Sequence, residues 1–220
     1  MLRAPLTTLL VMSIVAVFAL ELIFAFLGQG GLLRDLGANF GPLVAEGQLW
    51  RLVSSMFLHG GLFHLAVNGW ALYQLGTLVE LWMGKGRLLV VYVVTGVAGS
   101  IASVAWNLFG AEIPRPSVGA SGAIFGLLGA LIAFLVRRRD RLRPEAKSIL
   151  RSLSFWAAIN VFLGLTVPVI DNAAHLGGLF AGFALGWFLQ ARRRLRQPPP
   201  PPPDPQEVWT HPSSSSSTWS

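Results

Sequence analysis

The chain of 220 residues is poor in charge: 12% of its residues are charged and 53% are hydrophobic, whereas a soluble domain carries about 25% charged residues. Its net charge of +7 would suit a nucleic-acid partner, but the basic residues cluster in a pattern that argues against one. Cysteine is absent, which excludes a disulfide framework, a thiolate nucleophile and a cysteine-based metal site. The composition therefore indicates a membrane protein.

Six stretches of 19 to 30 residues contain at most one charged residue each. A helix crosses a membrane with about 20 apolar residues, so the sequence predicts six spans. The first, Leu6 to Leu27, is longer than the apolar core of a signal peptide, and we expect it to be retained. Glu21 within it is expected to be paired inside the bundle or near its outer rim. The following loop, Gly28 to about Phe57, is long and mixed in composition, and we expect it to lie in the outer membrane interface.

The basic residues fall mainly on one side of these predicted spans. If the N-terminus is cytoplasmic, 14 of the 17 basic residues lie on that side, and only Arg34, Arg51 and Arg115 lie on the other. This asymmetry follows the positive-inside rule and predicts that both termini are cytoplasmic. We expect an all-α, six-helix membrane domain over residues 1–196 and a disordered Pro/Ser-rich cytoplasmic tail over 197–220. The basic residues are then topology anchors, and the expected partner is the lipid bilayer, not nucleic acid.

Three predicted spans carry polar residues at a similar depth. Ser121 lies 16 residues before the next basic residue, and His175 and Asn68 each lie 17 residues before theirs, which is roughly 24 to 26 Å at the helical rise. His64 precedes Asn68 by four residues and therefore shares its helix face. Within a hydrocarbon core of about 30 Å, these side chains are expected to meet somewhat below the outer surface.

Each of these residues also has a purely structural explanation. Ser121 alone is explained as a helix cap or a small packing residue, and His175 or Asn68 as a buried hydrogen-bonding side chain. Together, however, they form the set needed for acyl transfer without a metal or cofactor. A histidine base activates a serine nucleophile, and side-chain donors join a backbone amide at a helix start to bind the oxyanion.

Small residues recur on one face of each span that carries Ser121 or His175. Glycines at this spacing let two helices approach closely, as a hydrogen bond between the two side chains requires, although generic helix packing explains them equally well. They are Gly122, Gly126 and Gly129 in the fourth span, and Gly178, Gly182 and Gly186 in the sixth.

Four short motifs occur in order along these spans: WR at 50–51, HGGLFHLAVN at 59–68, GASGAIFG at 119–126 and AHLGGLFAG at 174–182. In combination they resemble the motifs of the rhomboid intramembrane serine proteases, over about Trp50 to Gly186. The resemblance implies a catalytic dyad of Ser121 and His175, with the oxyanion bound by His64, Asn68 and Ser121. It also implies structural roles near the site for Trp50, Arg51, His59, Gly119, Gly122, Phe125, Gly178 and Gly182.

The resemblance further implies that the chain cleaves transmembrane segments of single-pass or other membrane proteins near the outer face, with the fifth span (about Ser152 to Ile170) as a mobile gate. Many family members have tyrosine where Phe125 stands, and phenylalanine keeps the ring that packs on the histidine. Asp171, one turn before His175, is interpreted as a loop residue and not as the acid of a triad. The Arg- and Ala-rich composition suggests a bacterial cell (inner) membrane.

Other classes fit less well. A non-catalytic rhomboid-like protein that binds membrane clients is the chief alternative, although such a protein is expected to lack the serine or the histidine. A transporter or channel is disfavoured because no broken-helix pair or inverted repeat is visible. The HExxH motif of a membrane metalloprotease is missing, and Ala123 breaks the GxSxG hydrolase pattern. The natural substrate and the oligomeric state stay open.

Overall fold

The structure, a computed structural model, describes residues 4–142, 144–167 and 170–189; the predicted tail over 197–220 lies outside them. Within these ranges the chain is helical, and its only extended pairing is an isolated bridge between Asn39 and Ser117. The predicted all-α class is therefore confirmed. Six helices have 16 residues or more: α1 (Pro5–Phe26), α5 (Leu62–Met83), α6 (Lys85–Phe109), α7 (Ser121–Val136), α8 (Pro144–Thr166) and α9 (Asn172–Phe188).

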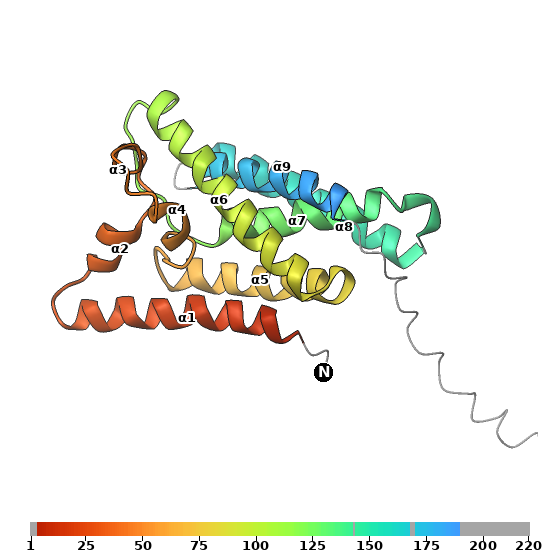
Figure 1. Ribbon diagram of the computed structural model, residues 1–220, viewed down its shortest axis with the longest axis horizontal. Helices are drawn as coiled ribbons and strands as arrows, with labels where there is room; N and C mark the ends of the chain where they lie inside the picture. Colours follow the sequence, from red (N-terminus) through yellow and green to blue (C-terminus); the bar gives the residue numbers. More distant parts are fainter. Residues whose placement is uncertain (1–3, 143, 168–169, 190–220) are drawn as a thin grey trace, which may run out of the picture.

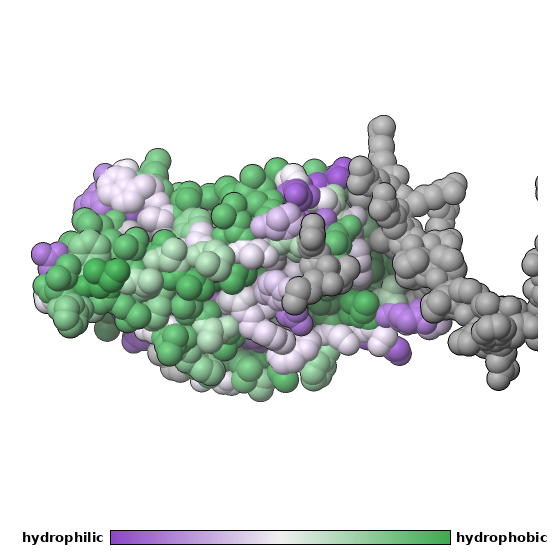
Figure 2. Space-filling model, turned by 90° about the horizontal axis from the view of Figure 1, so that it is seen from below, coloured by the Kyte–Doolittle hydropathy of each residue, from purple (hydrophilic) through white to green (hydrophobic). Residues whose placement is uncertain are grey.

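Three of these helices, α1, α6 and α8, are long and apolar enough to cross a membrane by length and composition, and α7 is a shorter apolar helix of 16 residues. The face of the molecule that carries α1 is hydrophobic over much of its left-hand part, whereas hydrophilic residues lie at its left end and within its right-hand half (Figure 2). An exterior of this kind suits lipid and not water. The chain is an integral membrane protein.

Short elements join the long helices. Between α1 and α5 lie α2 (Leu32–Gly37), α3 (Gly41–Ala45) and α4 (Arg51–Ser54), which gather at one end of the bundle (Figure 1). A 3-10 turn, η1 (Arg139–Arg141), follows α7. The long segment before α5 is therefore a folded cap on one end of the bundle, and it supplies walls to the site described next.

The central helix is α7, which buries 13 of its 16 residues (Figure 1). A helix that is apolar all round belongs in the interior of a bundle. It packs against α9 through small residues at four-residue steps on both helices. A side chain at Gly178 would meet the backbone of Gly122, and one at Gly182 or Gly186 would meet the backbone of Gly126 or Ala130. The residue numbers of these contacts rise together along the two helices, so α7 and α9 are parallel.

By contrast, α8 lies at the periphery. Only Leu153 and Ala157 of its 23 residues are buried, and Trp156 is 54% exposed. Its start corrects the sequence prediction, because the helix begins at Pro144 and not near Ser152. Proline suits the first position of a helix, where no backbone donor is needed. The first turns after Pro144 contain charged residues, so the helix begins before its apolar part.

The N-terminus of α1 is held by a carboxylate from α5. Glu80, buried to 6% exposure, accepts from the Thr7 amide at 2.8 Å, the Thr7 hydroxyl at 2.7 Å and the Leu6 amide at 3.2 Å. Helix starts leave unpaired N–H donors, and a negative group is favourable there. Glu80 therefore docks α1 onto α5 at the end of the bundle where the chain begins.

Replacing Glu80 with alanine is expected to lower the free energy of unfolding by about 2 to 4 kcal/mol, because buried donors of α1 lose their acceptor. Glu80→Gln keeps one acceptor oxygen and is expected to cost about half as much. Unfolding in detergent micelles, followed by the loss of helical circular dichroism, measures both values. Equal stability of Glu80→Ala and the unchanged protein would contradict this role.

Candidate active site

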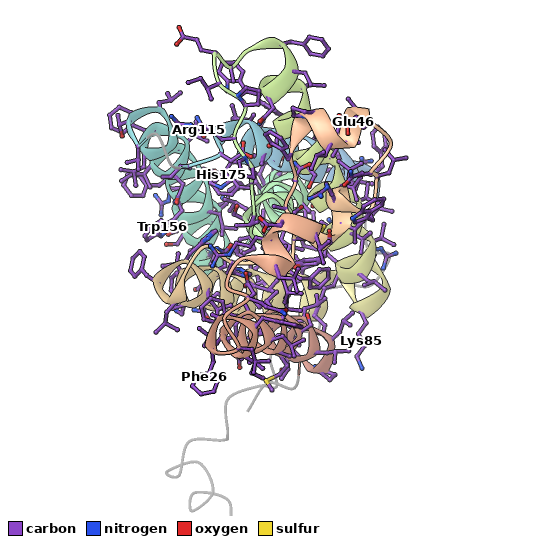
Figure 3. The ribbon with its side chains drawn as sticks, turned by 90° about the vertical axis from the view of Figure 1, so that its left-hand side faces the viewer. Phe26, Glu46, Lys85, Arg115, Trp156 and His175 are labelled. Atoms are coloured by element: carbon purple, nitrogen blue, oxygen red, sulfur yellow. The ribbon has the colours of Figure 1, made fainter. Side chains whose placement is uncertain are left out.

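The parallel register of α7 and α9 brings Ser121 and His175 to the same end of the helix pair. Gly122 faces Gly178 and also lies against Ala174, whose carbonyl oxygen is 3.5 Å from a side chain built at Gly122. Ser121 immediately precedes Gly122, and His175 immediately follows Ala174. Viewed from the end that carries α2 to α4, His175 lies inside the bundle, whereas Trp156 and Phe26 lie at its edge (Figure 3).

Ser121 is the first residue of α7 and not its cap. Ala120 occupies the cap position and makes no side-chain cap hydrogen bond, so the capping explanation of Ser121 is wrong. The Ser121 hydroxyl makes no hydrogen bond to another described residue. The first helical bond runs from the Ile124 amide to the Ala120 carbonyl, at 3.0 Å. The amides of Ser121 to Ala123 therefore precede the hydrogen-bonded ladder, as the first donors of a helix do.

The ring of Phe125 fixes the plane of the His175 imidazole. The two rings stack with their centroids 4.1 Å apart and an angle of 11° between their planes. Phe125 lies one turn after Ser121 on α7, so the same helix presents the serine and supports the histidine. The expectation that phenylalanine keeps the packing on His175 agrees with this stacking. The buried Nδ1 of His175 has no hydrogen-bond partner among the described residues.

The structure also corrects the sequence interpretation of Asp171. It is not a plain loop residue but the N-cap of α9, and its Oδ1 accepts from the Ala174 amide at 2.9 Å. Aspartate is among the best N-cap residues because its side-chain oxygen pairs a free amide of the first turn. An aspartate just before a helix is a known N-cap signal. The apolar pattern around Asp171 predicts the span but does not fix the residue at which its helix begins.

His64 and Asn68 reach the site from α5. They lie on one face of the helix, where the Asn68 side-chain amide donates to the His64 carbonyl at 2.9 Å. A side chain built at Gly119 would lie 2.7 Å from Cε1 and 2.9 Å from Nε2 of His64, and 3.9 Å from the Asn68 amide nitrogen. Gly119 also has a φ of +126°, which disfavours any other residue. The backbone just before Ser121 therefore packs directly on both side chains.

The segment that leads into Ser121 is tied to the first loop by backbone bonds. The Asn39 and Ser117 backbones exchange hydrogen bonds of 2.9 and 2.8 Å, and the Gly119 amide donates to the Ser55 carbonyl at 2.9 Å. Beside them lies a small pocket with a polar lining. Its hydrophilic residues come from the first loop, α6 and the start of α7: Asn39, Ser55, Ser100, Ser117 and Ser121.

The WR motif supports this loop from within. Arg51 is 5% exposed and donates to the Ala38 carbonyl at 2.9 Å, the Asp35 carbonyl at 2.8 Å and the Gln48 side chain at 2.8 Å. Trp50 is exposed, and its indole donates to the Leu36 carbonyl at 3.0 Å. An arginine that satisfies several buried carbonyls holds irregular backbone together. The hydrogen bonds of Trp50 and Arg51 therefore hold the first loop together.

Glu21 is paired, as the sequence suggested. Its carboxylate accepts from the Arg34 guanidinium at 3.0 Å and from the His59 amide at 3.2 Å, so it joins α1 to both ends of the first loop. His59 is fully buried, and burial, aided by the neighbouring His64, lowers its pKa to about 4, so its ring is neutral at pH 7. A cavity of about 500 Å³ beside Glu21 lies away from Ser121 and His175.

Residues 46–192 match the family model of the Rhomboid domain, which is more than half of the chain. This chain belongs to the rhomboid family. The match covers α5 to α9 and stops short of α1, so the rhomboid domain contains Ser121, His175, His64 and Asn68 together with the helices that carry them.

The chain is similar to several curated rhomboid proteins, and the names of two of them, GluP and the putative protease YdcA, refer to proteases. Rhomboid protease GluP of Bacillus subtilis is 44% identical over 148 residues, which are 67% of this chain and 27% of GluP. RHOMBOID-like protein 5 of Arabidopsis thaliana is 40% identical over 160 residues, 73% of this chain and 50% of that protein. YdcA of Bacillus subtilis is 31% identical over 163 residues, 74% of this chain and 78% of YdcA. The chain thus spans half or less of the length of the first two relatives.

Proposed function

We propose that this rhomboid protein is an intramembrane serine endopeptidase that cleaves transmembrane segments of membrane proteins near the outer face. The observation that carries this proposal is the parallel glycine register of α7 and α9, which brings Ser121 and His175 to the same end of two closely packed helices. The protease names among the relatives support the same activity.

The proposed reaction is a two-step acyl transfer on the dyad. His175 takes the hydroxyl proton as Ser121 Oγ attacks the carbonyl carbon of the scissile peptide, and the carbonyl oxygen becomes an oxyanion. His175 then gives its proton to the leaving amine, and the carbon–nitrogen bond breaks to leave an acyl-enzyme. In the second step water loses a proton to His175 and attacks the ester, and Ser121 recovers its proton as the new carboxyl end departs.

The oxyanion is proposed to lie among three donors. The Ser121 amide stands at the start of α7, where donors are free and the helix dipole favours negative charge. The His64 ring and the Asn68 side-chain amide, both from α5, lie next to the Gly119 backbone. Donors that are fixed before the reaction stabilise developing charge without reorganisation, and in many enzymes this stabilisation supplies most of the rate enhancement.

A single water for the second step is proposed to occupy the small polar pocket beside Ser121. The pocket is lined by serines and by Asn39, whose buried Oδ1 accepts no hydrogen bond from the described residues. A buried acceptor of this kind is usually satisfied by water. A water at this position would lie next to the serine that the proposed mechanism uses.

The remaining proposals concern the membrane. Six spans with cytoplasmic termini, formed by residues 1–196, place the end of the bundle with α2 to α4 outside, so that the exposed Trp50 reaches the interface. The sparse packing of α8 makes it the proposed gate for substrate helices. Substrates are proposed to be single-pass or other transmembrane proteins in a bacterial cell membrane. The tail over 197–220 is proposed to be a disordered cytoplasmic extension.

The test is cleavage of a single-span substrate by the protein in liposomes, combined with a serine-directed fluorophosphonate. We expect Ser121-dependent cleavage, and we expect mass spectrometry to find the phosphonyl group on Ser121 only. Cleavage that persists after loss of Ser121 would refute the mechanism. A folded protein that binds the substrate but neither cuts it nor takes up the label would instead indicate the non-catalytic client-binding alternative.

His64→Ala and Asn68→Ala are each expected to lower kcat by about 10² to 10³-fold with little change in KM, because the loss of an oxyanion donor acts on the transition state. Steady-state cleavage in liposomes measures both constants. Gln74→Ala in α5 provides the control, since Gln74 is an exposed residue well beyond Asn68 on the same helix. A rise in KM at constant kcat would assign His64 and Asn68 to substrate binding instead.

A further inference from the structure

The cap of α9 is bonded to a second helix. One oxygen of the Asp171 carboxylate accepts from the Ala174 amide at 2.9 Å, and the other accepts from the Ser103 hydroxyl of α6 at 2.5 Å. An N-cap needs only the first of these bonds. The second is a side-chain link between residues 68 positions apart in the sequence. It connects the turn that begins α9, one turn before His175, to a helix outside the α7–α9 pair.

Ser103 belongs to a chain of polar contacts that reaches the other side of the site. It is buried to 1% exposure, and its carbonyl accepts from the Asn107 side-chain amide at 3.1 Å. Asn107 Oδ1 in turn accepts from the Arg115 amide at 2.7 Å, in the segment that leads to Ser121. Two turns of α6 thus bind the segment before the proposed nucleophile and the cap before the proposed base.

The backbone of α6 also contacts both helices of the proposed dyad. A side chain built at Gly99, one turn before Ser103, would lie 2.7 Å from the Ala174 carbonyl oxygen and 3.3 Å from Cα of Gly122. These are the neighbours of His175 and Ser121 in the sequence. Because both helices rest on the same turn of α6, the separation of the two reacting side chains depends on how firmly each helix start is held there.

We infer that Asp171 is a positioning residue, which with Ser103 fixes the first turn of α9 on α6 and thereby sets the distance between His175 and Ser121. The His175 amide itself donates to the Asp171 carbonyl at 3.2 Å, so movement of the cap moves the histidine backbone. The role requires hydrogen bonds at two points of the Asp171 side chain and not its negative charge. The inference rests on the proposed function.

The test compares Asp171→Ala, Asp171→Asn, Ser103→Ala and the double alanine variant for kcat, KM and melting temperature in liposomes. Asp171→Ala is expected to lower kcat by about 10- to 100-fold at nearly constant KM, since a displacement of about 1 Å at a reacting group costs on the order of 10²-fold. Asp171→Asn is expected to restore most of the rate, because the amide oxygen still accepts from Ala174 and its NH2 group donates to Ser103. The double variant is expected to be no slower than Asp171→Ala alone, since both changes break one link.

Two matched controls separate positioning from general effects. Ser13→Ala removes a hydroxyl that bonds only within α1, and Asp140→Ala removes an aspartate that is 91% exposed; neither is expected to change kcat. Unchanged kcat in Asp171→Ala, or equal loss in Asp171→Asn, would overturn the inference. The inference would also be overturned if kcat of Asp171→Ala fell only in proportion to the fraction of folded protein. Failure of the proposed function is distinguishable, because cleavage by the unchanged protein would then be absent or independent of Ser121.

Discussion

Ser121→Ala is expected to reduce cleavage of a transmembrane substrate by about 10⁵ to 10⁶-fold, because the variant lacks the oxygen atom that is proposed to form the acyl-enzyme. His175→Ala is expected to be similarly inactive, since without a base the hydroxyl stays protonated. The double variant is expected to be no worse than either single one, as residues that act as a unit are strongly non-additive. Initial rates in liposomes with the substrate in excess measure all three.

The fold is expected to survive these changes. Ser121 makes no side-chain hydrogen bond to another described residue and does not cap α7, so alanine removes no structural contact of the hydroxyl. Melting temperatures within about 2 °C of the unchanged protein are the expected control result. Ser152→Ala, at an exposed position of the neighbouring α8, is expected to cleave normally. Cleavage by Ser121→Ala at even a tenth of the normal rate would show that another nucleophile acts.

Gly182→Ala is expected to cause a large structural effect for a single added methyl group. A side-chain carbon at Gly182 would overlap the carbonyl oxygen, carbonyl carbon and Cα of Gly126. These are backbone atoms, which cannot rotate aside as a side chain can, so α9 must shift away from α7. Overpacking of this kind costs about 1 to 3 kcal/mol, and the shift separates His175 from Ser121, which is expected to lower cleavage by on the order of 10²-fold.

The matched control is Gly69→Ala in α5. Gly69 is also in a helix, but a side-chain carbon there meets nothing within 4 Å. Alanine favours the helix over glycine by about 1 kcal/mol, so this variant is expected to be as stable as the unchanged protein or slightly more so. Thermal unfolding in detergent and cleavage rates report both effects. If Gly182→Ala and Gly69→Ala had the same melting temperature and cleavage rate, neither stability nor activity would depend on the close approach of α7 and α9.

The sequence was a good guide to the site wherever a periodic pattern marked a helix face. Glycine spacing predicted the approach of the spans that carry Ser121 and His175, and the four-residue step from His64 to Asn68 placed both on one face of α5. Periodicity is set by helix geometry, which a sequence displays directly. The partnership of these four residues in catalysis remains a prediction.

The contacts that the sequence did not predict depend on pairings between distant segments. The link from Ser103 to Asp171, the bridge between Asn39 and Ser117, and the docking of Glu80 on the start of α1 each join residues more than 60 positions apart. No local spacing marks such pairs, because they form only when helices from different parts of the chain are already packed. The early start of α8 was missed for a different reason, since its charged turns interrupt the apolar pattern that defined the span.

Because α8 buries only Leu153 and Ala157, most of its surface would already touch acyl chains in a bilayer. Swinging it outward would exchange contacts with α7 and α9 for contacts with lipid, which is as apolar as the side chains it replaces. The transfer free energy of this exchange is small, whereas the same motion in water would expose apolar surface at about 25 cal/mol per Å². The free energy of the proposed outward motion of α8 is therefore expected to be small in a bilayer and to depend on lipid packing and bilayer composition.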